Sequence, residues 1–160
     1  MPDRQTRSRQ AVAQAEPRLL DPAYRIYLAG PMTGLPEYNA PAFRAATFDL
    51  RNRGIEVWSP VEMDEEDGVN LEAEAASATT LHSDPGWDWA RALARDIGVV
   101  IRDVEAVVVL PGWTKSRGAF LETETAYAQG KSVLRYPDLE EIPYDRHPAR
   151  SGGKVQPAYV

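Results

Sequence analysis

The sequence predicts a single α/β domain of the Rossmann or flavodoxin-like kind, with helices on both faces of a parallel sheet of four or five strands. Apolar runs at 24–29, 55–58, 105–110 and 132–136 have the length of strands, and the third is typical of a strand buried on both faces. Segments with helical periodicity separate these runs, so crossovers should join consecutive strands and make them parallel.

The composition excludes several classes of function. At 160 residues the chain has room for one domain with a substantial core. The net charge of -6 provides no basic field for a polynucleotide or an anionic membrane, but a few local donors could still hold a small anion. The lack of cysteine excludes disulfides, thiolate catalysis and cysteine-ligated zinc. No apolar run is long enough for a membrane span or a signal peptide, so we expect a cytoplasmic protein.

The ends of the chain differ from its centre. Residues 1–22 are polar and predict a flexible N-terminal arm, 23–136 form the predicted domain, and the proline-rich residues 137–160 predict an extended C-terminal tail, in which His147 receives no role. Within the domain, 64–86 predicts an acidic surface excursion, or a lid over a ligand site. Its acidic run lacks the glycine spacing of a calcium loop, so the sequence indicates no metal site and no cofactor.

The first strand leads directly into the loop GPMTGLPEYN. Gly30 and Gly34 bracket this loop, whose backbone N–H groups could approach a ligand closely. The spacing fits neither a Walker A loop nor a dinucleotide-binding fingerprint. Asn39 is the predicted N-cap of a helix that carries its apolar face on Phe43, Ala46, Thr47 and Leu50.

Two acidic residues fall on helix faces that should be buried. Asp96 lies seven residues after Trp89, on the apolar face of a helix that begins near residue 87. Glu122 lies in the apolar stripe of a helix that starts at Ser116, just beyond the carboxyl end of the third strand, where open α/β sheets bind ligands. The alternatives are an intrahelical ion pair for Asp96 and a favourable dipole interaction for Glu122. Paired carboxylates are what glycosidic-bond chemistry uses.

These motifs, in this order, resemble the nucleoside 2-deoxyribosyltransferase-like superfamily. The resemblance covers 24–133 and depends on YLAGPMTG, on the acid of LARDI, and on SxGxxxE followed by AxxxGK. The superfamily includes deoxyribosyltransferases, deoxynucleoside 5'-monophosphate N-glycosidases and CMP hydrolases. LPGWxKSxGAxxE is typical of a poorly characterised branch found in phages and bacteria.

The resemblance implies roles for particular residues. It makes Glu122 the nucleophile, Asp96 the acid/base or ribose-binding residue, and Tyr27 the group that orients the nucleophile. We expect Tyr27 to keep the pKa of Glu122 low and burial to raise that of Asp96. The resemblance further implies a homodimer or a larger homo-oligomer.

A substitution within the motif favours a nucleotide over a nucleoside. Deoxyribosyltransferases often carry an aspartate at the position of Ser116, whereas a serine at a helix N-terminus, beside two cations, would attract a 5'-phosphate. One observation opposes this preference. Some hydrolases of the superfamily carry an arginine in the first loop that assists phosphate binding, and the corresponding residue here is Thr33. Tyr38 and Trp113 are candidates to stack on the base, although Trp113 could equally pack the loop. The expected substrate-binding residues are Gly30, Met32, Thr33, Gly34, Tyr38, Asn39, Trp113, Lys115, Ser116, Arg117 and Gly118.

The expected function is therefore an N-glycosidase that converts a (deoxy)nucleoside 5'-monophosphate to free base and sugar phosphate. Two alternatives remain open at this stage. One is a 2-deoxyribosyltransferase that exchanges bases, and the other is a nucleotide-binding domain without catalysis.

Overall fold

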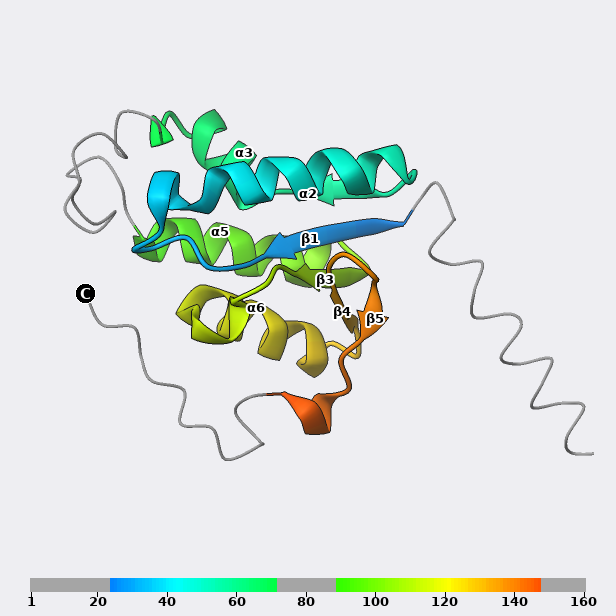
Figure 1. Cartoon of the computed structure of the whole chain (residues 1–160). Helices are drawn as coiled ribbons and strands as arrows, with labels where there is room; N and C mark the ends of the chain where they lie inside the picture. The colour runs from blue at the N-terminus through cyan, green and yellow to red at the C-terminus, as the bar shows by residue number, and fades with distance from the viewer. Residues whose placement is uncertain (1–23, 72–88, 148–160) are drawn as a thin grey trace, which may run out of the picture.

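The computed structural model describes residues 24–71 and 89–147, which form a three-layer α/β domain (Figure 1). Its sheet has five strands in the order β2-β1-β3-β4-β5. The strands are β1 Arg25–Ala29, β2 Glu56–Trp58, β3 Ala106–Val109, β4 Ser132–Arg135 and β5 Glu140–Glu141. The α-helices are α2 Ala40–Asn52, α3 Pro60–Glu66, α5 Trp89–Arg102 and α6 Arg117–Ala128. Short 3-10 turns occur at η2 Pro36–Asn39, η4 Trp113–Lys115 and η5 Tyr144–Arg146. The predicted Rossmann-like fold class is confirmed.

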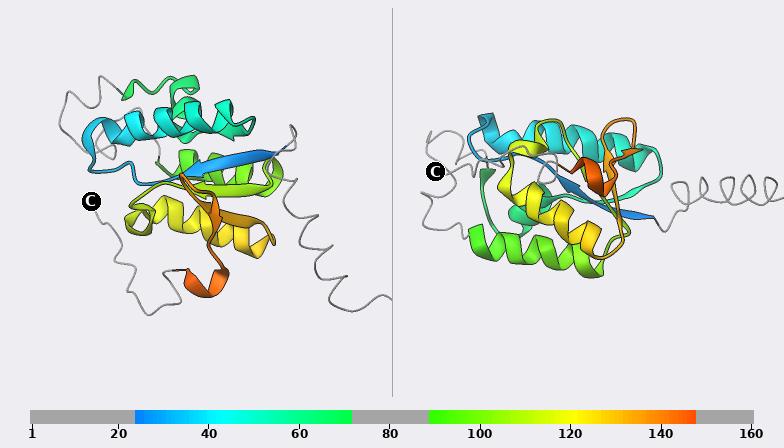
Figure 2. Two further views of the ribbon diagram at one scale, coloured as in Figure 1. Left: turned by 45° about the vertical axis from the view of Figure 1, so that its right-hand side comes forward. Right: turned by 90° about the horizontal axis from the view of Figure 1, so that it is seen from below.

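The sheet separates two apolar cores, which explains why its central strands are apolar throughout. Alternate side chains of β1 point to opposite faces. Ile26 and Leu28 pack with Phe43 and the rest of the inner face of α2. Tyr27 and Ala29 pack on the other face with residues of α5 and α6. Figure 2 shows these layers from two further directions. Tyr27 therefore points toward α5 and α6.

The parallel strands bring their following loops to one edge of the sheet. β1 pairs in parallel with β2 on one side and with β3 on the other, with Tyr27 opposite Trp58 and Val107. The chain turns in opposite directions from β1 and β3, so the carboxyl ends of these two strands form a topological switch point. The loop after β1 and the turn after β3 both lie there.

The lysine of the GK motif has a structural role. Lys131 Nζ donates to the carbonyl oxygens of Val100 at 2.6 Å and of Ile101 at 2.9 Å. These carbonyls belong to the last turn of α5, where they lack partners within the helix. The motif therefore fixes the end of α5 beside the start of β4.

Asn39 is the N-cap residue of α2, as predicted, but its side chain does not cap the helix. Glu37, Tyr38 and Asn39 are all in the left-handed region, and the Asn39 side chain makes no capping bond. Its Nδ2 donates to the Pro31 carbonyl oxygen at 2.9 Å. Asn39 therefore occupies the N-cap position of α2, while its side-chain amide holds the first loop through the Pro31 carbonyl.

The acidic segment after β2 begins as a helix that is partly buried. Residues 60–66 form α3, and Val61 and Asp64 on its inner face are buried, Asp64 with 3% of its surface exposed. The prediction of a surface excursion is wrong for Asp64, because an arginine on α5 compensates its buried charge. Residues 72–86, the rest of the predicted excursion or lid, lie outside the described residues.

The predicted C-terminal tail continues the fold as far as residue 147. After a cis Tyr136–Pro137 bond, β5 pairs antiparallel with β4, so the fifth strand is not parallel. Pairing continues with a hydrogen bond from Ile142 N to the Val133 carbonyl oxygen at 2.8 Å. His147 is fully buried against α6, where its ring nitrogen bonds to the Thr123 hydroxyl. The prediction of an extended tail is wrong for 137–147, while 1–22 and 148–160 lie outside the described residues.

Within the described part of the chain, none of the helices has the length and apolar character needed to cross a membrane.

Candidate active site

Glu122 projects from the second turn of α6 and meets Tyr27 of β1. The Tyr27 hydroxyl donates to Glu122 Oε1 at 2.9 Å, and both side chains are buried, with 5% of Glu122 exposed. The position of Glu122 follows from the helical stripe Ala119, Glu122, Thr123 and Ala126, which faces the sheet. The contact that the resemblance implied between this tyrosine and this glutamate is present.

Asp96 reaches the same place from α5. It is 7% exposed, and its Oδ1 accepts from Nε of the preceding residue, Arg95, at 2.9 Å. Its partner is thus its immediate neighbour and not Arg102, whose guanidinium lies over Gly98. Asp96 raises the pKa of Glu122 through its charge, and it interacts with the Tyr27 hydroxyl. The two predicted acids therefore converge on one cleft.

Arg95 connects this acid pair to α3. Its Nη2 donates to Asp64 Oδ1 at 2.8 Å and its Nη1 to Asp67 Oδ2 at 2.7 Å. Arg95 and Asp64 were not predicted to be site residues. A basic residue directly before a buried acid in LARDI was the available signal for Arg95. Asp64 stood in an acidic run, which normally forms a solvated surface.

Burial dominates the electrostatics of the two acids. It raises the pKa of Glu122 to about 8, assisted by the charge of Asp96 and opposed by the Tyr27 hydrogen bond. It also raises the pKa of Asp96 to about 6, against the lowering effect of Arg95. The expectation of a low pKa for Glu122 is wrong, because one hydrogen bond does not offset burial beside a second acid.

The acid pair consequently holds one proton near neutral pH. Between about pH 6 and about pH 8 one of the two carboxyl groups is ionised and the other is protonated. Burial and the two acids also raise the pKa of Tyr27 well above its ordinary value, so its hydroxyl remains a donor. The cleft thus offers an anion, an acid and a fixed hydrogen-bond donor.

The first loop and the start of α6 complete the cleft. Its lining from these segments consists of Gly30, Pro31, Met32, Thr33, Lys115, Ser116, Arg117, Gly118 and Ala119. Ser116 is the N-cap of α6, and its Oγ accepts from Ala119 N at 3.2 Å. A Cβ at Gly118 would lie 3.9 Å from both Glu122 Oε1 and Ser116 Oγ. The glycine therefore keeps the space beside these two oxygens open.

Close packing explains the other predicted glycine of the lining. A Cβ at Gly30 would approach Leu110 Cβ to 3.0 Å and Phe43 Cζ to 3.3 Å. Gly30 thus allows the loop to cross tightly over the end of β3, which places its backbone at the cleft.

Four predicted substrate-binding residues do not line the cleft. Tyr38 is buried in the core beneath α2, and Asn39 only holds the loop at Pro31. Gly34 adopts a φ of 80° with nothing within 4 Å of a Cβ placed there. Trp113 is buried against His147, with ring centroids 5.6 Å apart, so the alternative that it packs the loop is the one observed.

Trp89 lines the cleft, whereas Tyr38 and Trp113, the aromatic residues predicted to stack on the base, do not. It lines the cleft at the start of α5, and the Arg117 guanidinium lies 5.1 Å from its ring centroid. Its position seven residues before Asp96, on the same helix face, was the signal that could have identified it. Pro60, Ala92 and Leu93 also line the cleft and were not predicted to do so.

Among residues 24–71 and 89–147, no group of three histidine or acidic side chains is arranged to hold a metal ion. The Arg95 guanidinium, which pairs with both Asp64 and Asp96, occupies the position that a metal cation would take between those acids.

Fold and site together define a Rossmann-like α/β protein with a buried acid pair beside a helix N-terminus at the switch point of its sheet. The chain belongs to the family described as Domain of unknown function (DUF4406), whose match covers residues 24–135. A search of curated proteins found no match to the sequence.

Proposed function

We propose that the protein is an N-glycosidase that hydrolyses a (deoxy)nucleoside 5'-monophosphate to free base and sugar phosphate. The observation that carries the proposal is the Glu122 carboxyl group, held by Tyr27 at 2.9 Å and accompanied by Asp96 in one cleft. The resemblance of the motifs to the nucleoside 2-deoxyribosyltransferase-like superfamily supports the same chemistry.

The proposed reaction proceeds in two displacements. Glu122, once ionised, attacks C1' of the sugar while the C1'–N bond to the base breaks, and the base accepts a proton from Asp96 or from solvent. Water then attacks C1' of the glycosyl ester while the bond from C1' to the Glu122 oxygen breaks, and the proton from water passes to the Asp96 carboxylate or to solvent. This step releases the sugar phosphate and the Glu122 carboxylate. Tyr27 orients the carboxyl group throughout. Positive charge that develops at C1' favours the ionised form of Glu122 in the transition state.

The single proton of the acid pair fits this scheme. Before substrate binds, the proton belongs to Glu122, because burial raises the pKa of Glu122 to about 8 but that of Asp96, where Arg95 opposes the effect, only to about 6. The proposal requires that this proton moves to Asp96 or to solvent before Glu122 attacks C1'. Proton transfer from Asp96 to the base predicts a bell-shaped pH dependence of kcat/KM, with limbs near 6 and 8. If solvent instead protonates the departing base, kcat/KM should rise through pH 8 to a plateau.

The start of α6 supports a phosphorylated substrate. The helix has twelve residues, its first three residues line the cleft, and Ser116 can donate its hydroxyl hydrogen while its oxygen accepts from Ala119. Lys115 and Arg117 line the same part of the cleft. These groups would hold a 5'-phosphate at one end while the acid pair acts at C1'.

The test is a panel of ribo- and deoxynucleosides and their 5'-monophosphates, assayed for released base by chromatography. We expect release from a monophosphate, abolished in Glu122→Gln. Ser116→Asp retains an N-cap oxygen but places a negative charge beside the phosphate, so it should depress turnover of the monophosphate far more than turnover of the nucleoside. Ser116→Thr is the matched control and should retain the preference.

Other results would redirect the proposal. Exchange of the base when a second free base is added would identify a transferase. Nucleotide binding that survives Glu122→Gln, without base release from any compound, would identify a binding domain and refute the glycosidase. We also propose a homo-oligomer, on the basis of the resemblance, and light scattering of the purified protein tests it.

A further inference from the structure

The acid pair does not stand alone in the cleft, because α3 contributes Asp64 to the same lining. Asp64 is buried, and burial raises its pKa against the opposing influence of Arg95. Two acids on two different helices, Asp64 and Asp96, are thus joined through one guanidinium. In the glycosidase mechanism given above, neither Asp64 nor Arg95 contacts the sugar or the base, and Asp64 has no role.

The guanidinium of Arg95 is fully engaged by these contacts. Nε donates to Asp96, Nη1 to Asp67 and Nη2 to Asp64, all at 2.7 to 2.9 Å. Only Asp67 of the three is well exposed, with 53% of its side chain accessible, against 4% for Asp64 and 10% for Asp96. A planar fork of this kind fixes the orientation of each carboxylate, which a flexible ammonium group would not do.

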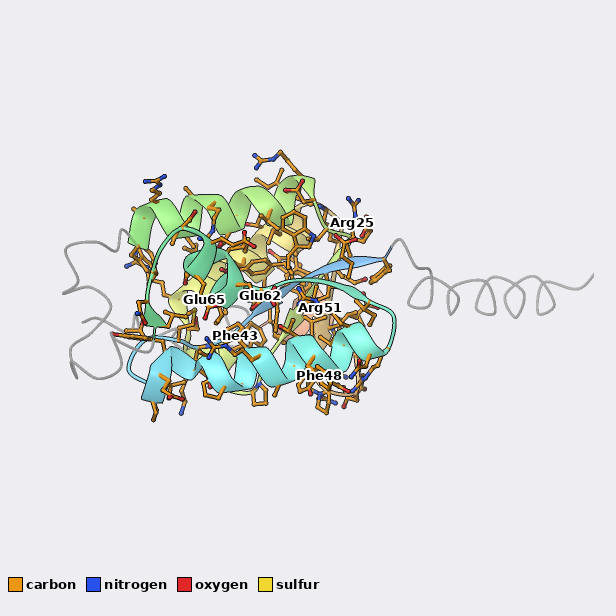
Figure 3. All side chains as sticks on the ribbon, turned by 90° about the horizontal axis from the view of Figure 1, so that it is seen from above. Arg25, Phe43, Phe48, Arg51, Glu62 and Glu65 are labelled. Carbon is orange, nitrogen blue, oxygen red and sulfur yellow. The ribbon has the colours of Figure 1, made fainter. Side chains whose placement is uncertain are left out.

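The two sides of α3 carry different kinds of ion pair. Toward α2, Glu62 pairs with Arg51 and Glu65 with Arg44, and these four side chains are well exposed. Figure 3 labels Glu62, Glu65 and Arg51 of this group. Exposed pairs of this type contribute little to stability. Toward α5, the pair is buried and borders the cleft. Burying a charged network costs more than packing apolar residues of the same volume, so its position beside the acid pair calls for another explanation than stability.

We propose that Arg95 is a positioning residue that fixes the Asp96 carboxylate in the cleft and fastens α3, through Asp64, as a wall of the same site. The functional part of this inference rests on the proposed glycosidase, whereas the positioning itself does not. Arg95 touches no reacting atom in this scheme and acts through Asp96.

The groups that face Asp96 are few and come from four elements. They are Arg95 of α5, Tyr27 of β1, Glu122 of α6 and Asp64 of α3. Arg95 is the cation of this set, and the two other acids oppose ionisation of Asp96. Loss of an opposite charge at this distance raises a carboxyl pKa by about one to three pH units. Without Arg95 a larger fraction of the molecules would hold two protons on the acid pair near neutral pH and would lack an ionised carboxylate there.

The first experiment needs no activity. Titration of the side-chain carboxyl carbons by nuclear magnetic resonance, with the Asp96 signal assigned by Asp96→Asn, compares wild type with Arg95→Gln. We expect the Asp96 midpoint to rise by about one pH unit or more in Arg95→Gln. Arg44→Gln removes an ion pair of α3 on its other side and should leave the midpoint unchanged. An unchanged midpoint in a folded Arg95→Gln protein overturns the proposal.

A second variant covers the case in which Arg95→Gln does not fold. Arg95→Lys keeps the positive charge but cannot reach three carboxylates at once, so the Asp96 midpoint should rise less than on full loss of the charge. Its midpoint should nevertheless differ from wild type, and coincidence of the two titration curves overturns the proposal.

The second experiment uses base release. In Arg95→Gln the acidic limb of kcat/KM should move upward with the Asp96 midpoint, and Arg44→Gln should keep the wild-type limb. A purely structural Arg95 would lower the amount of active protein without moving the limb. If wild type releases no base from any substrate, the glycosidase proposal fails, while the carboxyl titration still decides the role of Arg95.

Discussion

The raised pKa of Glu122 has a direct consequence for stability, which Glu122→Gln exposes. Glutamine keeps the size and the acceptor for the Tyr27 hydroxyl but cannot ionise. In wild type, the pKa of Glu122 rises from 4.5 in the unfolded chain to about 8 in the folded protein. Between these values the folded state retains a proton that the unfolded chain has lost. The free energy of unfolding must therefore decrease as the pH rises through this window.

The magnitude follows from the two pKa values. A difference of about 3.5 pH units corresponds to on the order of 5 kcal/mol, at 1.36 kcal/mol for each unit. Below pH 4.5 wild type and Glu122→Gln should unfold with similar free energies, since both side chains are neutral. At pH 8 and above, the variant should be the more stable protein by several kcal/mol. The raised pKa of Asp96 also makes the free energy of unfolding decrease with pH, between pH 3.8 and about pH 6. This decrease remains in Glu122→Gln.

The assay is urea unfolding at pH 4.5, 6, 7 and 8, followed by the fluorescence of the four tryptophans. The informative quantity is the difference in unfolding free energy between the two proteins at each pH. Glu66→Gln replaces an exposed acid of α3 and serves as the control, whose difference from wild type should stay constant. A difference between Glu122→Gln and wild type that is also constant with pH would refute the conclusion that Glu122 holds its proton in the folded protein.

Three further substitutions test neighbouring contacts. Tyr27→Phe removes the donor to Glu122 and should lower kcat/KM for base release about 10- to 100-fold, measured at the pH optimum, and a rate equal to wild type would contradict the orienting role. Gly118→Ala should leave the melting temperature equal or higher, since alanine favours a helix, yet weaken nucleotide binding in calorimetry by filling the space beside Glu122. Equal affinity would exclude this part of the cleft as the binding site. His147→Ala should reduce the unfolding free energy by about 2 to 4 kcal/mol in denaturant titrations, and a change below the experimental error would show that the ring is dispensable.

The fold class was accessible from sequence because its signals are local. A short run of branched aliphatic residues such as Ala106–Val109 is typical of a strand buried on both faces, and the helical stripes around it indicate the layers. The fifth strand was not accessible. Glu140 and Glu141 lie on an exposed edge and show no apolar alternation, so their pairing with Leu134 and Arg135 depends on the turn that precedes them.

The candidate site was accessible where an unusual residue sits in a regular pattern. Glu122 and Asp96 stood out because an acid in an apolar stripe is costly without a partner. Asp64 gave no such signal, since its neighbours are also acidic and its partner, Arg95, is thirty-one residues distant. The pKa of Glu122 was misjudged for a similar reason. Sequence supplies the hydrogen-bond partner, but it does not supply the degree of burial that outweighs it.

The packing of His147 sets a practical boundary for anyone who shortens this chain. The family match ends at residue 135, but the imidazole is enclosed by the rings of Trp113, Phe120 and Tyr127 and bonds to Thr123 at 2.9 Å. A protein cut at 135 would leave this aromatic surface uncovered and turn β4 into an unprotected outer strand, ready to join another copy. Expression of the domain for crystallisation should therefore extend through residue 147.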